Sequence, residues 1–282
     1  MTLDLSLVDK PTAPKSHAYT WKDTVLYALG IGAKVDELDY LFEGRGPLVY
    51  PSFAVVPGFA PIFELLAQTK ADFAMVVHGC QRVRLHAPIA SAGTFHTTAK
   101  IRGIYDLRRL ASIAIDTETK DDAGKLLFDT SWNIIVRGAG GFGGHPPPKE
   151  DTGIAVPKDR APDFRIEEPT TKEQALLYRL SGDLNPLHAD PAFAKAVGFE
   201  QGPILHGLCT YGFMVRHVAK GACGGDASKL TGFEAQFRKP VWPGDTIVTE
   251  GWNVAPGKIA ISVRVKERDE AVISGAWATT SS

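Results

Sequence analysis

A carboxylate and an imidazole separated by four residues stand in the most informative segment of the chain, SGDLNPLHADP at residues 181–191. These groups are Asp183 and His188. Between them, Pro186 pushes Asn185 out of helical geometry toward an extended conformation. The two side chains therefore lie on a bent loop, which can direct both toward one point. A carboxylate and an imidazole placed in this way can move protons to and from a bound water.

A backbone amide is the third candidate group. Residues 208–218 form an apolar run whose length and composition predict a buried helix. Gly207 would stand at its start, where N–H groups lack partners and the helix dipole is positive. Such an amide can stabilise an oxyanion, and glycine lets a ligand approach closely. The opposing interpretation is that an Asp–His pair is more often structural, and that His206 alone is more often a packing residue. The Asp183–His188 spacing matches no metal-binding motif.

The loop is bounded by elements that the sequence also predicts. Asp190 followed by proline is typical of a helix start, and Gly198 suits the end of a short helix over residues 192–197. Two alternating strand patterns, each with a Pro–Gly turn, recur in the same order in both halves of the chain. Each is followed by another strand and by a Trp-containing strand. The first copy comprises residues 81–95, 112–116 and Trp132, and the second comprises residues 236–247, 259–265 and Trp277.

This repeat indicates an α+β protein built from two copies of one unit, each with a helix ahead of antiparallel strands. A chance match among ordinary strands is the alternative. The glycines and prolines of residues 138–148, followed by a charged stretch, predict a linker over residues 138–160. The linker separates an N-terminal unit, residues 1–137, from a C-terminal unit, residues 161–282. A phosphate-binding glycine loop is rejected, because no Lys-Ser/Thr ending and no helix signal follow.

Composition narrows the classes of function. With 31 basic and 32 acidic residues among 282, the chain has a formal net charge of -1, which offers no field to hold nucleic acid. Cys80, Cys209 and Cys223 show no C-x-x-C spacing, which argues against a disulfide framework or a zinc site. We see no signal peptide and no apolar stretch near ~20 residues, so we expect a cytoplasmic protein that is not inserted in a membrane.

The stretch over residues 178–213 resembles the signature of the hydratase 2 group of the MaoC-like dehydratases, which includes the hydratase domain of peroxisomal multifunctional enzyme type 2. Blocks at residues 77–79, 136–144 and 237–244 continue the resemblance in family order, from about residue 19 to residue 278. It implies a double hot-dog fold of two fused units, with the catalytic motif in the second. It also implies that the first unit has lost part of its central helix, which makes room for a bulky acyl chain. Pro57-Gly58 and Pro61 fit such an interruption.

The resemblance implies reversible syn hydration of trans-2-enoyl-CoA to (R)-3-hydroxyacyl-CoA. Asp183 and His188 match the catalytic pair, Asn185 a residue that holds the loop, and Gly207 the glycine whose N–H binds the thioester oxygen. No metal or redox cofactor is expected, since CoA enters as part of the acyl-CoA substrate, and a homodimer is expected. The candidate substrate contacts are His206, Arg238, Lys239, Gly79, Arg108 and Arg109.

The sequence departs from the family at two places. Cys80 stands where a glutamate is common, and we expect it to be a small buried hydrophobe. The stretch over residues 105–113 lacks the usual lysine–glycine pair. Its two arginines, Arg108 and Arg109, either contact CoA phosphates or form a solvated turn, which we favour.

Three other functions stay open. The first is hydration or dehydration of another acyl thioester: a branched, dicarboxylic or steroid side-chain CoA, or an acyl-carrier protein. The second is a non-catalytic acyl-CoA-binding subunit, which intact Asp183, His188 and Gly207 argue against. The third is a thioesterase, which would release free CoA thiol.

Overall fold

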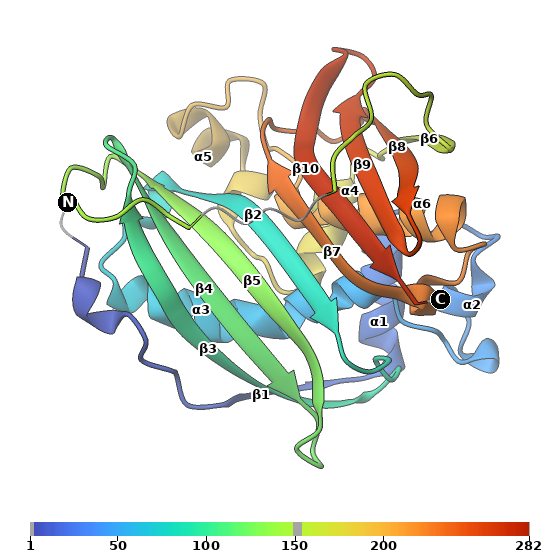
Figure 1. The fold of residues 1–282 in the computed structure, drawn as a ribbon, viewed down its shortest axis with the longest axis horizontal. Helices are drawn as coiled ribbons and strands as arrows, with labels where there is room; N and C mark the ends of the chain where they lie inside the picture. Colours follow the sequence, from blue (N-terminus) through green and yellow to red (C-terminus); the bar gives the residue numbers. More distant parts are fainter. Residues whose placement is uncertain (1–2, 149–153, 282) are drawn as a thin grey trace.

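Ten strands formed by the described residues build one antiparallel sheet in the order β1-β3-β4-β5-β2-β7-β10-β9-β8-β6 (Figure 1). The computed structural model describes residues 3–148 and 154–281. The N-terminal half supplies β1 (Lys15–Tyr19), β2 (Val76–Leu85), β3 (Gly93–Asp106), β4 (Leu110–Lys120) and β5 (Leu126–Arg137). The C-terminal half supplies β6 (Phe164–Pro169), β7 (Leu230–Phe237), β8 (Thr246–Ala255), β9 (Lys258–Val265) and β10 (Glu270–Thr280).

The two halves of the sheet have corresponding strand orders. Read outward from the centre, the order is β2-β5-β4-β3-β1 on one side and β7-β10-β9-β8-β6 on the other, and β2 pairs with β7 where they meet. Trp132 of β5 and Trp277 of β10 occupy corresponding strands, opposite Gln81 of β2 and Glu234 of β7. The predicted repeat is therefore confirmed, and the architecture is a double hot-dog of the α+β class.

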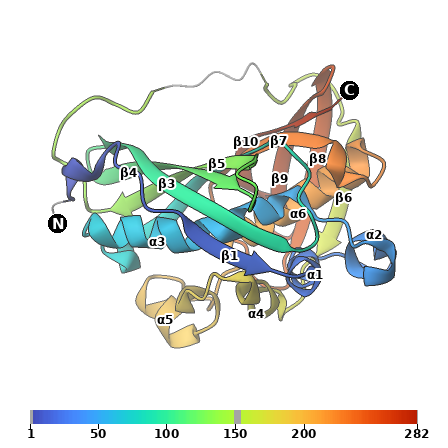
Figure 2. The ribbon, with the colours of Figure 1, turned by 90° about the horizontal axis from the view of Figure 1, so that it is seen from below.

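The helices lie on one side of this sheet, with α4 and α5 farthest from the strands (Figure 2). They are α1 (Trp21–Gly30), α2 (Leu38–Leu41), α3 (Phe59–Gln68), α4 (Gln174–Tyr178), α5 (Pro191–Ala196) and α6 (Gly207–Ala222). The buried helix predicted over residues 208–218 is confirmed, since every residue from Leu208 to Ala219 is buried in α6. None of the described helices is both long and apolar enough to cross a membrane.

The central helix of the first half is shorter than its counterpart α6. Residues Pro51–Gly58 form a 3-10 helix, and α3 follows with 10 residues against 16 in α6. Pro57 lies inside the 3-10 segment, as the predicted interruption requires. Pro61 does not interrupt α3, because it lies in the first turn, where the N–H groups have no partner within the helix.

Every second residue of a strand points into the core. Phe95, Thr97, Ala99 and Ile101 of β3 are almost fully buried, with one intervening residue each, as the two-residue period of a strand requires. The Thr97 hydroxyl bonds that of Thr119 on β4 at 2.9 Å, so the polar groups inside the sheet are paired.

The first part of the predicted linker is anchored to the sheet. The carboxylate of Asp106, at the end of β3, accepts hydrogen bonds from the N–H groups of Gly141 at 3.0 Å and Gly143 at 2.5 Å. A Cβ on Gly140 would lie 2.4 Å from the carbonyl oxygen of Arg108, so only glycine permits this approach. Residues 138–143 are thus held against the β3–β4 turn, whereas residues 149–153 lie outside the described part of the chain.

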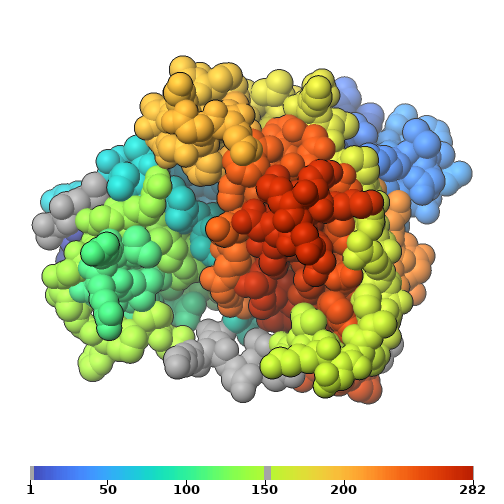
Figure 3. Space-filling view, turned by 90° about the horizontal axis from the view of Figure 1, so that it is seen from above, coloured from blue at the N-terminus to red at the C-terminus, as the bar shows by residue number. Residues whose placement is uncertain are grey.

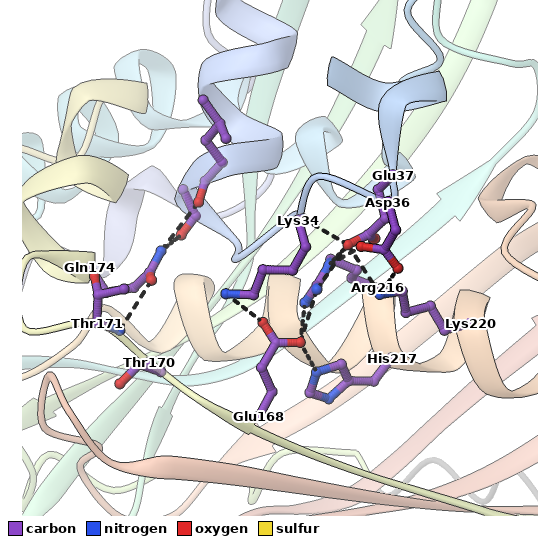
Figure 4. Close-up of polar contacts among 12 residues, drawn as sticks. Lys34, Asp36, Glu37, Glu168, Thr170, Thr171, Gln174, Arg216, His217 and Lys220 are labelled. Atoms are coloured by element: carbon purple, nitrogen blue, oxygen red, sulfur yellow. Dashed lines mark hydrogen bonds and ion pairs between the residues drawn. The ribbon is translucent and has the colours of Figure 1, made fainter. Parts of the chain in front are cut away.

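A buried ionic cluster joins the two halves (Figure 4). The guanidinium of Arg216, on α6, is fully buried and donates to Glu37 at 2.9 and 3.0 Å and to Glu168 at 2.9 Å. Glu37 belongs to the N-terminal half and Glu168 to β6. Lys34 and Lys220 reach these carboxylates from the rim, each at 3.2 Å. Since α6 also carries Gly207, the cluster fixes the helix that reaches the candidate site.

Candidate active site

The segment from Asp183 to His188 is a bent loop, as predicted. The Asp183 carboxylate accepts the N–H of Asn185 at 3.2 Å, and the Asn185 side chain accepts the N–H of Leu187 at 3.0 Å. A single 3-10 turn over Pro186–His188 follows. These short-range bonds orient the loop without a helix, because Asx-type turns satisfy the backbone locally. The predicted part of Asn185 in holding the loop agrees with this geometry.

The orientation of the His188 ring leaves one nitrogen free to act as a base. His188 is 8% exposed, and its Nδ1 lies 2.8 Å from the carbonyl oxygen of Ile204. A carbonyl only accepts, so Nδ1 carries the proton and donates. Nε2 of the neutral ring therefore keeps a lone pair. Burial lowers the pKa of His188, an effect that the nearby Asp183 charge opposes.

A second imidazole, His206, lies against the first. The two ring centroids are 3.7 Å apart with 28° between the planes. Nε2–H of His206 donates to the main-chain carbonyl of Asp183 at 3.1 Å. One side-chain ligand atom from each of Asp183, His188 and His206 lies within 4.8 Å of the others. Nδ1 of His188 and Nε2 of His206 each donate to a main-chain carbonyl, so one nitrogen of each ring is already committed to the protein.

Gly207 begins α6, as predicted, and no side chain at the helix start neutralises the positive end of the helix. The preceding residue, His206, makes no side-chain capping bond, and the first turn of α6 carries no acidic residue. The N–H groups at a helix start have no carbonyl partners within the helix, and the dipole is positive there. This end of α6 is therefore suited to bind an oxygen that carries negative charge.

These groups meet in the wall of one cavity of about 350 Å³, which we name the catalytic cavity. Asp183, Asn185, His188 and Gly207 line it together with apolar side chains from both halves. Figure 3 views the molecule from the end where α5 projects and shows a hollow between its two lobes. The apolar lining was not predicted from the sequence; from the N-terminal half it includes Phe59, Ile62, Phe63, Leu66, Val76, Val77 and Trp132.

Comparison with known proteins places this site in a family. Residues 17–138 match the MFE-2 hydratase 2 N-terminal domain, and residues 154–275 match the MaoC like domain. The chain is 38% identical over 280 residues to 3-hydroxyacyl-thioester dehydratase Y of Mycobacterium tuberculosis, and the alignment covers 96% of this chain and 94% of that protein. The chain belongs to the MaoC-like hydratase 2 family.

Two further members of the family extend the comparison. A probable enoyl-CoA hydratase 2 of Dictyostelium discoideum is 36% identical, over 97% of this chain and 95% of that protein. The crystal structure of a MaoC-like dehydratase from Phytophthora capsici superimposes with a TM-score of 0.88 at 31% identity, over 99% of this chain and 98% of that one. Relatives named hydratase and dehydratase add or remove water, and this chain is likewise a hydro-lyase.

The remaining residues predicted for this hydratase 2 site lie in three different places. Arg238 and Lys239 line the catalytic cavity. Gly79 lines a second cavity of about 410 Å³, which shares Val77, His78, Trp132, Phe237 and Arg238 with the first. Arg108 and Arg109 are exposed at the β3–β4 turn and line neither cavity, which agrees with the solvated turn that we favoured.

Two details differ from the sequence-based expectation. Cys80 is partly exposed and lines the second cavity, so the prediction of a small buried hydrophobe was wrong. The β2–β5 register shifts between His78 and Cys80, and after this irregularity the thiol faces the cavity and not the core. His206 is almost fully buried at the back of the catalytic pair and is not among the residues that line the catalytic cavity.

Proposed function

We propose that the chain catalyses the reversible syn addition of water to a trans-2-enoyl-CoA, which gives an (R)-3-hydroxyacyl-CoA. The observation that carries the proposal is the meeting of the Asp183 carboxylate, the free Nε2 of His188 and the Gly207 amide in the wall of one apolar cavity. Similarity to a relative named enoyl-CoA hydratase 2 supports a CoA thioester as substrate.

In this proposal Asp183 and His188 hold one water molecule between them. The pair removes a proton from the water as oxygen bonds to C3 and delivers a proton to C2. The two groups act together on this one water, and neither is assigned as the sole acid or the sole base. Proton transfer of this kind contributes about 10²–10⁴ in rate. CoA is part of the substrate, and the chemistry draws on protein groups alone.

The negative charge that develops on the thioester oxygen would be held by the Gly207 N–H. A Cβ on Gly207 would lie 3.4 Å from the Phe237 ring, which is an ordinary contact. Packing within the protein therefore does not demand glycine at this position, and we assign the missing side chain to the close approach of the thioester. One such donor is typically worth ~10²–10³ in rate.

The direction of addition follows from the placement of the pair. Asp183 and His188 lie on one loop and approach the double bond from one side, which supports syn addition. The (R) configuration is carried over from the hydratase 2 resemblance. We assign Arg238 and Lys239, at the wall of the catalytic cavity, to the CoA phosphates.

The test is ultraviolet assay of enoyl-CoA hydration over a series of acyl lengths, with chiral analysis of the product. We expect turnover of crotonyl-CoA and longer enoyl-CoAs, with (R)-3-hydroxyacyl-CoA formed and no free thiol released. Formation of the (S) product, or release of CoA thiol without hydration, would contradict the proposal. A parallel assay with the matching acyl-carrier-protein thioester separates the two carriers.

We expect the rate of hydration to fall in acid through the titration of His188. Burial lowers the pKa of His188 below its ordinary value of 6.5. The ring therefore stays neutral until the pH falls below this lowered pKa. Protonated Nε2 has no lone pair with which to accept a proton from water. A profile of kcat/KM from about pH 4 to 8 should place the acid midpoint below 6.5. A midpoint above 6.5 would show that the site favours the charged ring.

A further inference from the structure

His206 contacts two of the groups that we place in the reaction, Asp183 and His188, and directly precedes the third, Gly207. Its Nε2–H donates to the carbonyl oxygen of Asp183 at 3.1 Å, and its ring stacks on His188 with centroids 3.7 Å apart. It also immediately precedes Gly207 as the N-cap residue of α6. The ring of Tyr178 also lies beside it, with centroids 5.0 Å apart.

The usual roles of a buried histidine do not account for these contacts. His206 makes no side-chain capping bond to α6, and its Nδ1 is buried without a hydrogen-bond partner. It is 1% exposed, and it is not among the residues that line the catalytic cavity. The contacts of the ring that the structure shows are therefore made through its Nε2–H and its face.

We propose that His206 is a positioning residue for hydration, which fixes the Asp183 backbone and the His188 ring at the separation that one water requires. This inference rests on the proposed hydratase function. The hydrogen bond holds the main chain from which the Asp183 carboxylate projects, and the stacked face restricts rotation of the His188 ring. Effective proton transfer depends on such placement, and an error of about 1 Å can cost ~10²-fold in rate.

The charge state of His206 suits this role. Its pKa lies well below the ordinary value because of burial first and of the neighbouring His188 second. His206 therefore stays neutral while His188 takes up a proton, and the donor to Asp183 is kept throughout. A second positive charge in the stack would repel the imidazolium that forms during the reaction.

Three substitutions separate the hydrogen bond from the stacked face. His206→Gln can keep a donor near the position of Nε2 but loses the ring, whereas His206→Phe keeps the ring and loses the donor. His206→Ala loses both. We expect kcat for crotonyl-CoA hydration to fall about tenfold in each of the first two variants and about 100-fold in the third. KM should stay within about twofold, because the residue does not line the cavity.

Two further readouts belong only to a positioning role. In the Asp183→Asn background, His206→Ala should lower kcat by less than about twofold more, because the pair that it positions acts as a unit and that unit has already been broken. The acid midpoint of kcat/KM should move to higher pH in His206→Ala, because water admitted beside His188 relieves the burial that lowers its pKa.

A matched control is His217→Gln, since His217 is a buried histidine on the same helix that contacts Thr249 and Glu168 far from the reacting groups. This variant should lose thermal stability but keep its kcat. Rates are expressed per folded enzyme, measured by near-ultraviolet circular dichroism. If His206→Gln and His206→Phe behave like the control, the residue is structural, and if only KM rises, it is a substrate contact. Either result overturns the inference, whereas a wild-type chain without hydratase activity overturns the proposed function itself.

Discussion

Asp183→Asn is expected to lower kcat for enoyl-CoA hydration by about 10³-fold, within the 10²–10⁴ range of general acid–base catalysis, without unfolding the protein. The amide has the shape of the carboxylate and keeps an oxygen to accept the Asn185 N–H, so the loop can form. An amide cannot take up a proton from water. His188→Ala should cost a similar factor, because it removes the free Nε2. Initial rates with crotonyl-CoA and circular dichroism spectra of both variants provide the measurement.

The control is Asp190→Asn, which alters another carboxylate a few residues away. Asp190 caps α5 by accepting the N–H of Ala192 at 2.8 Å, and asparagine caps equally well. This variant should keep its full rate. The double variant of Asp183 and His188 should lose little more than either single change, because residues that act as a unit are not additive. Near-normal turnover in Asp183→Asn or His188→Ala would refute the assignment.

The part of the site that the sequence predicts is the part that local backbone chemistry determines. The proline after Asn185 excludes a helix through the loop, and the apolar run after Gly207 requires one. These two constraints predict the bent loop and the start of the helix, whereas the meeting of the carboxylate, the imidazole and the amide at one site was implied by the resemblance to the hydratase 2 group. The repeat of strand, turn and tryptophan likewise predicts two matching units, because strand alternation and Pro–Gly turns are short-range features.

The rest of the site depends on contacts between distant segments, which no local pattern encodes. Side chains of α3 reach the cavity only because β2 pairs with β7 and unites the two halves in one sheet. His206 was interpreted from the sequence as more often a packing residue and was also named as a candidate substrate contact; in the structure its ring stacks on His188 and is not among the residues that line the catalytic cavity. Arg108 and Arg109 belong to a stretch in which the sequence departs from the family, and they lie on a turn that lines neither cavity.

The ion pairs of Arg216 likewise could not be predicted from local sequence patterns. Its carboxylate partners Glu37 and Glu168 are 179 and 48 residues away in the chain. In the sequence Arg216 appears only as a polar interruption of an otherwise apolar helix. Burial raises the pKa of Glu168, but hydrogen bonds from His217 and Arg216 outweigh this effect and lower it to about 2. The carboxylate therefore stays charged in the interior and depends on its partners.

Arg216→Met is accordingly expected to lower the free energy of unfolding by about 3–5 kcal/mol, the usual result of removing one partner from a buried ion pair. Methionine fills much of the same volume, so the loss comes from two buried carboxylates left without their main cation. Urea unfolding followed by circular dichroism measures it. The control is Lys220→Met on the same helix, whose ammonium reaches Glu37 at 3.2 Å from the rim and is 29% exposed. Solvent screens that pair, so we expect a loss of about 1 kcal/mol or less.

A second comparison separates unpaired charge from lost packing. In the triple variant Arg216→Met, Glu37→Leu, Glu168→Leu, all three charges are replaced by apolar groups, and stability should recover most of the loss, because desolvation no longer opposes folding. Two results would contradict this explanation: a free energy of unfolding of Arg216→Met equal to that of the triple variant, or one within about 1 kcal/mol of the wild type. Either would show that unpaired buried charge is not the cause of the loss. Recovery in the triple variant would show that the loss in Arg216→Met comes from unpaired buried carboxylates and that apolar packing can replace the contribution of the cluster to stability.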